Sequence, residues 1–205
     1  MPYILVYGTL MRGNLNEGYL KGQEFIGEAV TLAEDFILVS MTLQSGMSHE
    51  FPGAVPGQDE HKYSNVVYGE LYRVSNECLR ILDMHEGCMT NDPRKPRPFG
   101  YYRIRTSVKL MNGLTINDKS VVNDVEIYVM SRSRAMDGIR RGGSFVKNGK
   151  WTEPDRNKTI RADRERARHE RTRLDAIRAA HKRSLMHQPS PLALMRARKR
   201  FQGVL

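Results

Sequence analysis

The chain has 205 residues, with 33 Lys and Arg against 23 Asp and Glu, a formal net charge of +10. Hydrophobic residues make up 40% of it and the mean hydropathy is -0.55, so a core can form although some of the chain is expected to lie outside it. This length allows one domain with an appendage or two very small domains, and no stretch approaches the roughly 18 apolar residues that span a membrane.

The first predicted element is a buried strand at Pro2–Val6, an apolar run that stops before Gly8. No basic segment precedes it, so the sequence predicts no secretory signal. The loop that follows is Tyr7-Gly8-Thr9-Leu10-Met11-Arg12-Gly13-Asn14. Glycine after a strand permits close approach of a ligand, and free N–H groups in such a loop can bind a carboxylate or phosphate. The alternative is an ordinary turn, which the local pattern alone favours; without a following Lys-Ser/Thr, the loop is not of the nucleotide-binding type.

Further along, short β-rich segments predict several more strands. These segments are Phe36–Val39, Val66–Val74, Tyr102–Val108, Val121-Val122 and Val125–Val129. In the second of them, Val67, Gly69, Leu71 and Arg73 share one face. Asn112-Gly113 predicts a tight hairpin turn. The pattern indicates an α+β domain built on a curved, mixed or mostly antiparallel sheet, most simply a small β-barrel.

One helix is well marked, between Ser75 as N-cap and Gly87 as the residue after its end. Its predicted apolar stripe consists of Cys78, Leu79, Ile81 and Leu82. Cys88 is the only other cysteine. Two cysteines at this spacing form neither a disulfide framework nor a zinc site, so we expect a reducing, cytoplasmic compartment.

The end of this helix, Leu82-Asp83-Met84-His85-Glu86-Gly87, holds a candidate catalytic carboxylate, Glu86. A carboxylate at a helix C-terminus faces the negative end of the helix dipole, which raises its pKa. A carboxyl group with a raised pKa beside an apolar pocket can act as a general acid and base. The alternative is a solvated glutamate, which is the more common case for a single residue. Asp83 could equally be structural, and His85 need not cooperate with Glu86 because adjacent helical residues diverge by about 100°.

Other candidate sites are weaker. His49 and His61 fall in loop-like stretches without a second pair of ligands, so no metal site is expected. Arg140-Arg141-Gly142-Gly143 is a basic glycine segment of a kind found in nucleic-acid-binding proteins, but a single copy is more often a turn. No serine or cysteine triad can be read from the chain.

The positive charge is concentrated at the C-terminal end. Residues 153–205 hold 15 Lys and Arg against 6 Asp and Glu, a net charge of +9, whereas residues 1–152 hold 18 against 17, a net charge of +1. We therefore predict a domain over 1–152 and a basic arm, largely helical or partly disordered, over 153–205. Within the arm, Thr159–Met186 predicts a long helix and Leu192–Phe201 a short one.

Several segments, in order along the chain, resemble the gamma-glutamylcyclotransferase-like family, particularly its gamma-glutamylamine cyclotransferase and AIG2-like branch. They are Val6–Gly13, Phe51–Val55, Val67–Tyr72, Leu82–Gly87, Tyr101–Arg103 and Ile127–Val129. The resemblance covers residues 1–150 and none of the arm. It implies a small mixed β-barrel with flanking helices.

The resemblance also implies a site and a reaction. Glu86 would be the general acid/base, and the backbone of Tyr7, Gly8, Thr9 and Leu10 would hold the α-carboxylate of a small γ-glutamyl substrate. Tyr101, Tyr102 and Arg103 would lie at the pocket. The α-amine would attack the γ-carbonyl of the same molecule, releasing 5-oxoproline and an amine, with no metal, nucleotide or other cofactor.

Two further expectations concern departures from this pattern. Cys88–Phe99 is longer and more basic than a short connection needs; it either borders the pocket and selects the leaving group or is a surface insertion. The arm, residues 154–205, either is a solvated tail or binds a nucleic acid or an acidic protein through its charge. Its apolar stripe is too thin for a membrane. A non-catalytic binding protein that acts through this arm is therefore the alternative to the enzyme.

Overall fold

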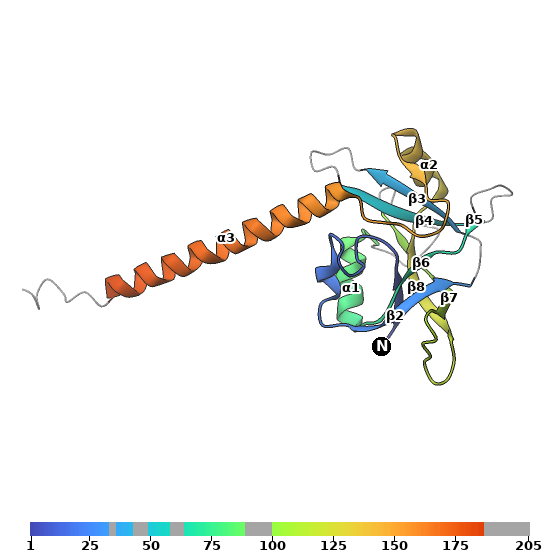
Figure 1. The fold of residues 1–205 in the computed structure, drawn as a ribbon, viewed down its shortest axis with the longest axis horizontal. Helices are drawn as coiled ribbons and strands as arrows, with labels where there is room; N and C mark the ends of the chain where they lie inside the picture. The colour runs from blue at the N-terminus through green and yellow to red at the C-terminus, as the bar shows by residue number, and fades with distance from the viewer. Residues whose placement is uncertain (33–35, 43–48, 58–63, 89–99, 187–205) are drawn as a thin grey trace, which may run out of the picture. The chain divides into compact units, whose positions relative to one another are not determined.

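The structure is a computed structural model that describes residues 1–32, 36–42, 49–57, 64–88 and 100–186. The chain forms two compact units, Met1–Arg161 and a second that begins at Ala162. Figure 1 shows the elements of the first unit, which are β-strands with helices on their outer faces. In the described part of the chain, no helix is both long and apolar enough to cross a membrane.

A closed β-barrel forms the centre of the first unit, with strand order β1-β6-β2-β7-β8. The strands are β1 (Tyr3–Val6), β2 (Glu24–Thr31), β6 (Tyr68–Arg73), β7 (Tyr102–Leu110) and β8 (Val121–Val129). Neighbours pair antiparallel except β1 and β8, which run parallel and close the barrel. The predicted α+β class and small mixed barrel are confirmed.

The apolar run of β1 is explained by burial on both of its faces. Leu5 packs inside the barrel with Leu71 and Ile127, and none of the three is exposed. Ile4, on the opposite face, packs outside the barrel against a helix, in a cluster that includes Leu82. A strand covered on both sides needs a continuous apolar sequence instead of an alternating one.

That helix is α1 (Asn76–His85), and its ends are as predicted. The Cys78 backbone N–H donates to Oγ of Ser75 at 3.0 Å, and Gly87 has φ +68°. The predicted apolar stripe is wrong at Ile81, which is 45% exposed. Cys78, Leu79 and Leu82 lie within about 100° of one another around the helix axis, and Ile81 lies about 60° outside that arc.

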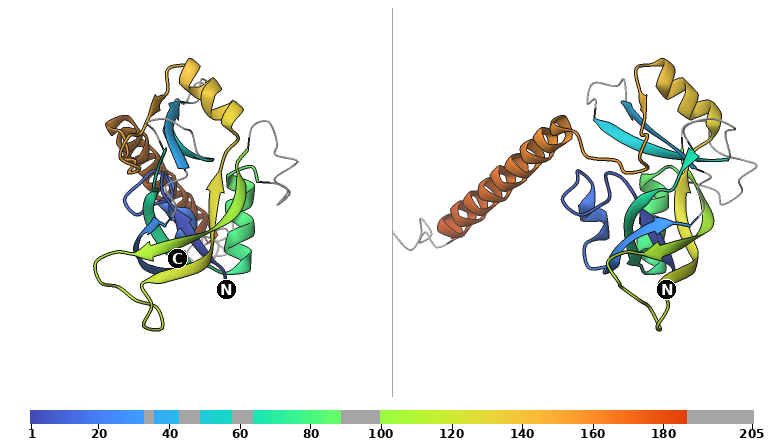
Figure 2. Two further views of the ribbon diagram at one scale, coloured as in Figure 1. Left: turned by 90° about the vertical axis from the view of Figure 1, so that its right-hand side faces the viewer. Right: turned by 45° about the vertical axis from the view of Figure 1, so that its right-hand side comes forward.

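A second sheet lies beside the barrel and is covered by a helix that the sequence analysis did not find. β3 (Phe36–Thr42) lies at its centre, paired with β4 (Glu50–Pro56), β5 (Ser64–Asn65) and β9 (Ser144–Phe145). The helix is α2 (Arg132–Arg140), and its buried Ala135 packs against Ile37 and Val55 of the sheet. Figure 2 shows α1 beside the barrel and α2 against the second sheet; a short 3-10 helix, η1 (Glu17–Leu20), contacts α1.

The predicted turn between β7 and β8 is confirmed, although the connection is longer than a two-residue hairpin. Asn112 and Gly113 both have positive φ, 59° and 74°, as a type I′ turn requires. A second turn of the same kind follows at Asn117-Asp118 before β8 begins.

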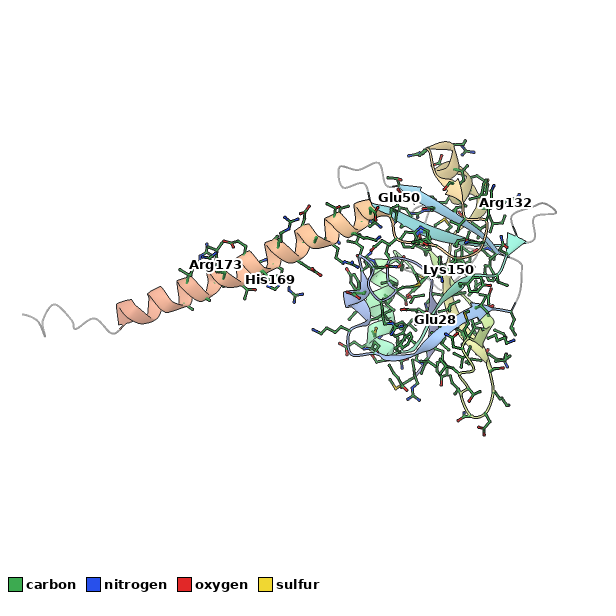
Figure 3. All side chains as sticks on the ribbon, in the orientation of Figure 1. Glu28, Glu50, Arg132, Lys150, His169 and Arg173 are labelled. Atoms are coloured by element: carbon green, nitrogen blue, oxygen red, sulfur yellow. The ribbon has the colours of Figure 1, made fainter. Side chains whose placement is uncertain are left out.

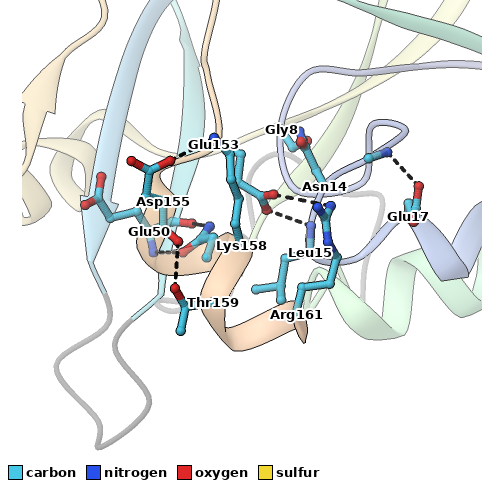
Figure 4. Close-up of polar contacts among 12 residues, drawn as sticks. Gly8, Asn14, Leu15, Glu17, Glu50, Glu153, Asp155, Lys158, Thr159 and Arg161 are labelled. Atoms are coloured by element: carbon cyan, nitrogen blue, oxygen red, sulfur yellow. Dashed lines mark hydrogen bonds and ion pairs between the residues drawn. The ribbon is translucent and has the colours of Figure 1, made fainter. Parts of the chain in front are cut away.

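The predicted arm helix is present as α3 (Asp155–Met186), and its first turns belong to the first compact unit. Figure 4 shows the contacts at this point: Glu153 accepts a hydrogen bond from the Leu15 N–H at 2.7 Å and lies 3.5 Å from Arg161. Asn157, which is fully buried, accepts from the Glu50 N–H at 2.9 Å and donates to its carbonyl at 2.6 Å.

The part of α3 in the second unit carries exposed, mostly charged side chains as far as they are described. Figure 3 shows His169 and Arg173 standing out from the helix. Asp163 and Arg166, three residues apart on this helix, form an ion pair at 2.9 Å. The predicted helix Leu192–Phe201 and the insertion 89–99 lie outside the described residues.

Candidate active site

A cavity of about 360 Å³ in the first unit brings together most of the residues singled out in the sequence. It is lined by Leu5, Val6, Tyr7, Gly8, Thr9, Leu10, Asn16, His49, Phe51, Pro52, His85, Glu86, Gly87, Tyr101, Tyr128 and Arg134. The loop after β1, the end of α1 and the segment before β7 therefore meet at one place. Tyr102 and Arg103 are not among the lining residues.

Carbonyl groups of the loop after β1 accept hydrogen bonds from residues that follow closely in the chain. The Gly8 carbonyl accepts from the Met11 N–H at 3.0 Å and from Nδ2 of Asn14 at 2.9 Å, and the Thr9 carbonyl accepts from the Asn16 N–H at 2.8 Å. The N–H groups of Gly8, Thr9 and Leu10 make no hydrogen bond within the described part of the chain. A buried loop whose amides have no internal partner is suited to hold an anion.

A buried carboxylate fixes the far side of this loop. Glu70, on β6, is 8% exposed and accepts from the Arg12 backbone N–H at 2.9 Å and from its Nε at 3.0 Å. The Tyr72 hydroxyl donates to the same carboxylate at 3.0 Å. Charge-assisted hydrogen bonds of this kind are stronger than neutral ones, so they hold the loop in one conformation.

Tyr7 and Gly8 connect the loop to both sheets. The Tyr7 hydroxyl donates to the Tyr128 carbonyl at 2.7 Å and accepts from the Ala54 N–H at 3.0 Å, and burial raises the pKa of this phenol. A Cβ on Gly8 would lie 2.3 Å from Cγ of Pro52, so only glycine allows the loop to pack so closely on β4.

Glu86 is the C-cap of α1, with φ -78° and ψ -4°. Its N–H donates to the Leu82 carbonyl at 2.8 Å, and its own carbonyl accepts from the Tyr101 N–H at 3.1 Å. Burial raises the pKa of its carboxyl to about 7, against a smaller lowering by the positive charge of Arg134. The sequence analysis expected this direction from the helix dipole, whereas the structure gives burial as the leading cause.

A charged network holds the end of α1 that carries Glu86. Oδ1 of Asp83 accepts from Nε of Arg103 and from the Tyr128 hydroxyl, both at 2.7 Å, and Arg103 also pairs with Glu126 at 3.2 Å. Arg103 and Asp83 therefore tie the helix to the barrel instead of lining the cavity. The hydroxyl of Tyr101 donates to the Pro52 carbonyl at 2.6 Å and joins the cavity wall to β4.

The sequence analysis did not assign to the site the basic side chains that line the cavity, Arg134, His49 and His85. Arg134 lies on α2, a helix that was not predicted, although Ser131 does cap it by accepting from the Arg134 N–H at 3.4 Å. His49 and His85 were considered but assigned no place at the pocket. Among the described residues, no group of three His, Cys, Asp or Glu side chains is placed to hold a metal ion.

Comparison with known proteins identifies the family and the fold. Residues 4–153 match the family described as "Gamma-glutamyl cyclotransferase, AIG2-like". Gamma-glutamylaminecyclotransferase of Rattus norvegicus is 34% identical over 90 residues, which are 43% of this chain and 56% of the relative. Gamma-glutamylaminecyclotransferase B of Danio rerio is 27% identical over 136 residues, which are 64% of this chain and 61% of the relative.

The matches span somewhat more than half the length of these two curated relatives. The crystal structure of an AIG2-like protein from Mus musculus has a similar fold, with a TM-score of 0.52 and 22% identity over 74% of this chain and 88% of that one. The family match covers the barrel, the loop after β1 and the helix that ends at Glu86. The chain therefore belongs to the AIG2-like gamma-glutamyl cyclotransferase family.

Proposed function

We propose that this protein is a γ-glutamyl cyclotransferase that converts a small γ-glutamyl compound to 5-oxoproline and a free amine. The observation that carries this proposal is the convergence, in one cavity, of unpaired loop N–H groups and a carboxyl group with a pKa near neutrality. The first can hold a carboxylate, and the second can move a proton at physiological pH.

In the proposed reaction, the N–H groups of Gly8, Thr9 and Leu10 hold the α-carboxylate of the substrate. Glu86 takes one proton from the α-ammonium, and the neutral amine then attacks the γ-carbonyl carbon to close a five-membered ring. Glu86 returns this proton to the leaving nitrogen and takes the second proton from the attacking nitrogen, so that the bond from the γ-carbon to the leaving nitrogen breaks and the lactam forms. The released amine then receives the second proton from Glu86. One group serves all these transfers because its pKa lies close to the working pH.

The remainder of the catalytic task is positioning, because both reacting groups belong to one molecule. A free γ-glutamyl chain is flexible, and holding it folded with amine and carbonyl in contact removes much of the entropic barrier. The fixed loop and the packed wall at Tyr7 and Tyr101 are suited to this role. Water has no part in the ring closure.

The proposal is tested by mass spectrometry of 5-oxoproline released from a panel of γ-glutamyl amines, amino acids and peptides. We expect release by the wild type and a loss on the order of 10²- to 10⁴-fold in Glu86→Gln, which cannot accept the proton. Glu77→Gln is the matched control, because Glu77 is exposed on the same helix. Full activity of Glu86→Gln would refute the role given to Glu86, and no release from any compound would refute the activity.

The pH dependence gives a second readout of the same role. A free-enzyme base must be deprotonated, so kcat/KM should fall as the pH drops below about 7. An acid limb near pH 4.5, the ordinary range of a glutamate, would contradict the buried environment described for this carboxyl.

A further inference from the structure

One charged group of the cavity has no part in the proposed reaction, the guanidinium of Arg134. Its carbon Cζ lies 5.8 Å from the centre of the Tyr101 ring, and the side chain lines the same cavity as Glu86. Its Nη1 is buried and donates no hydrogen bond within the part of the chain that the structure describes. A buried cationic donor without an acceptor is costly to a fold, and a bound anion would relieve that cost.

Glu86 does not supply this anion directly. No ion pair within 4.0 Å joins Arg134 and Glu86 among the described residues. Arg134 acts on Glu86 only through its charge, which lowers the pKa of the carboxyl slightly against the effect of burial. The nitrogen Nη1 is therefore available to a ligand that enters the cavity.

Arg134 enters the cavity from a different part of the fold than the loop proposed to hold the α-carboxylate. Arg134 belongs to α2, which packs on β3 and β4 of the second sheet. Phe51 and Pro52 of β4 line the same cavity. The loop after β1 and Glu86 belong to the barrel and to α1, whereas this part of the cavity lining comes from α2 and the second sheet, elements that Figure 1 labels.

We propose that Arg134 is a specificity residue that binds a carboxylate on the amine half of the substrate, the half that leaves. This inference rests on the proposed function. A γ-glutamyl compound carries one α-carboxylate, which the loop holds, and its γ-carbonyl is neutral, so a second anion can come only from the amine half. Arg134 then favours γ-glutamyl compounds whose leaving amine carries a carboxylate over those whose leaving amine does not. A planar guanidinium matches the two oxygens of that carboxylate.

Two substrates isolate this contact, γ-glutamyl-L-alanine and γ-glutamylethylamine, whose leaving amines differ only by one carboxylate. In Arg134→Met we expect kcat/KM for γ-glutamyl-L-alanine to fall by about 10- to 100-fold, the value of a hydrogen bond to a charged group. The value for γ-glutamylethylamine should stay within about twofold. Both are measured at about pH 8.5, because the loss of Arg134 raises the pKa of Glu86 and would otherwise reduce both rates.

Matched variants separate the contact from a general effect on α2. Arg140→Met removes the same charge from the same helix, where Arg140 is exposed and pairs with Asp137, and should change neither substrate. Arg134→Lys keeps the charge without the planar fork and should restore part of the preference. An equal fall for both substrates in Arg134→Met would overturn the proposal, since Arg134 would then act on the shared glutamyl half or on the fold.

Binding calorimetry in the Glu86→Gln background separates this proposal from the activity itself. Without turnover, γ-glutamyl-L-alanine should still bind more tightly than γ-glutamylethylamine, and Arg134→Met should abolish the difference. If the wild type releases no 5-oxoproline but this preference is found, the activity fails and the subsite stands. If neither compound is preferred, the subsite is refuted whatever the activity.

Discussion

Glu86 obtains its chemical character from its surroundings. It follows the last residue of α1, its side chain forms no hydrogen bond or ion pair among the described residues, and the protein packed around it raises the pKa of its carboxyl to about 7. Burying a carboxyl group in this way disfavours its charged form. The folded protein therefore has to tolerate a group that would be more stable in water.

Because burying the charged carboxylate costs stability, we expect Glu86→Gln to stabilise the protein at neutral pH. The pKa is raised in the folded state, so the folded chain holds the proton more tightly than the unfolded chain between about pH 4.5 and 7. The free energy of unfolding of the wild type therefore falls by on the order of 2 to 3 kcal/mol as the pH rises through this window. The Glu86→Gln variant does not lose this stability, because glutamine cannot ionise.

Urea unfolding of both proteins at pH 5, 6, 7 and 8 measures this difference. The free energy of unfolding of Glu86→Gln should exceed that of the wild type by an amount that grows from pH 5 to 7 and then stays constant. Glu77→Gln should follow the wild type at every pH, because Glu77 is exposed. A difference in the free energy of unfolding between Glu86→Gln and the wild type that stays constant from pH 5 to 8 would show that Glu86 titrates in its ordinary range.

At the residue scale, the sequence identified the loop and the carboxylate but not the cation. Gly8 and Glu86 are marked by local signals, a glycine after a strand and a glutamate before a helix-ending glycine. Arg134 has no such signal, because it reaches the cavity from α2 and depends on how that helix packs on the second sheet. Arginine in a basic chain is too common to single out by type.

At the scale of elements, the orientation of α1 rests on the contacts of Asp83. This carboxylate lies two residues before His85, the last residue of α1, and joins Arg103 of β7 to the Tyr128 hydroxyl of β8. The side chain of Arg103 is 8% exposed and that of Asp83 is 20% exposed. Removing one charge from such a pair leaves the other buried without full compensation.

We therefore expect Asp83→Asn to lower the free energy of unfolding by about 1 to 3 kcal/mol and to reduce kcat as the end of α1 loosens. Glu24→Gln is the comparison, because Glu24 pairs with Arg73 at the surface, where such a pair contributes about 0 to 1 kcal/mol. Denaturant unfolding and 5-oxoproline release measure the two effects. Equal effects of the two variants would show that Asp83 does not position the helix.

Elements with a regular pattern were predictable, and elements with an interrupted one were not. β1 and β3 are continuous apolar runs, and α1 has both of its caps. β2 was missed because Glu24, Gly27 and Glu28 break its alternation, and the structure has a register shift between Phe25 and Gly27. Such a bulge inserts one residue and reverses the inside-outside pattern after it.

At the scale of the whole molecule, the closure of the barrel depends on one pairing between distant parts of the chain. β1 pairs parallel with β8, Leu5 opposite Ile127. No local pattern specifies a pairing over this separation, so the barrel was supported mainly by the family resemblance. The binding role predicted for residues 154–205 stays a prediction.

The division into body and arm leads to a prediction about truncation. The composition changes at Trp151–Pro154, but Glu153 and Asn157 are buried in the first unit. A chain ending at Thr152 loses their three hydrogen bonds, about 3 kcal/mol in total, and Tm should fall by about 10 °C. A chain ending at Arg161 should keep the Tm of the full chain, as thermal unfolding would show; equal values for both truncations would contradict these contacts.

The contacts of Glu153 have a practical consequence for work on this protein. Its carboxylate accepts from the Leu15 N–H, in the same loop that offers its amides to the cavity. A fluorescent label or surface tether attached between Glu153 and Arg161 would disturb the contacts that hold this loop, and with them the signal that the label reports. A tag placed at Ala162 or beyond leaves the contacts of Glu153 and Asn157 intact, so immobilised or labelled protein can be compared directly with the free protein.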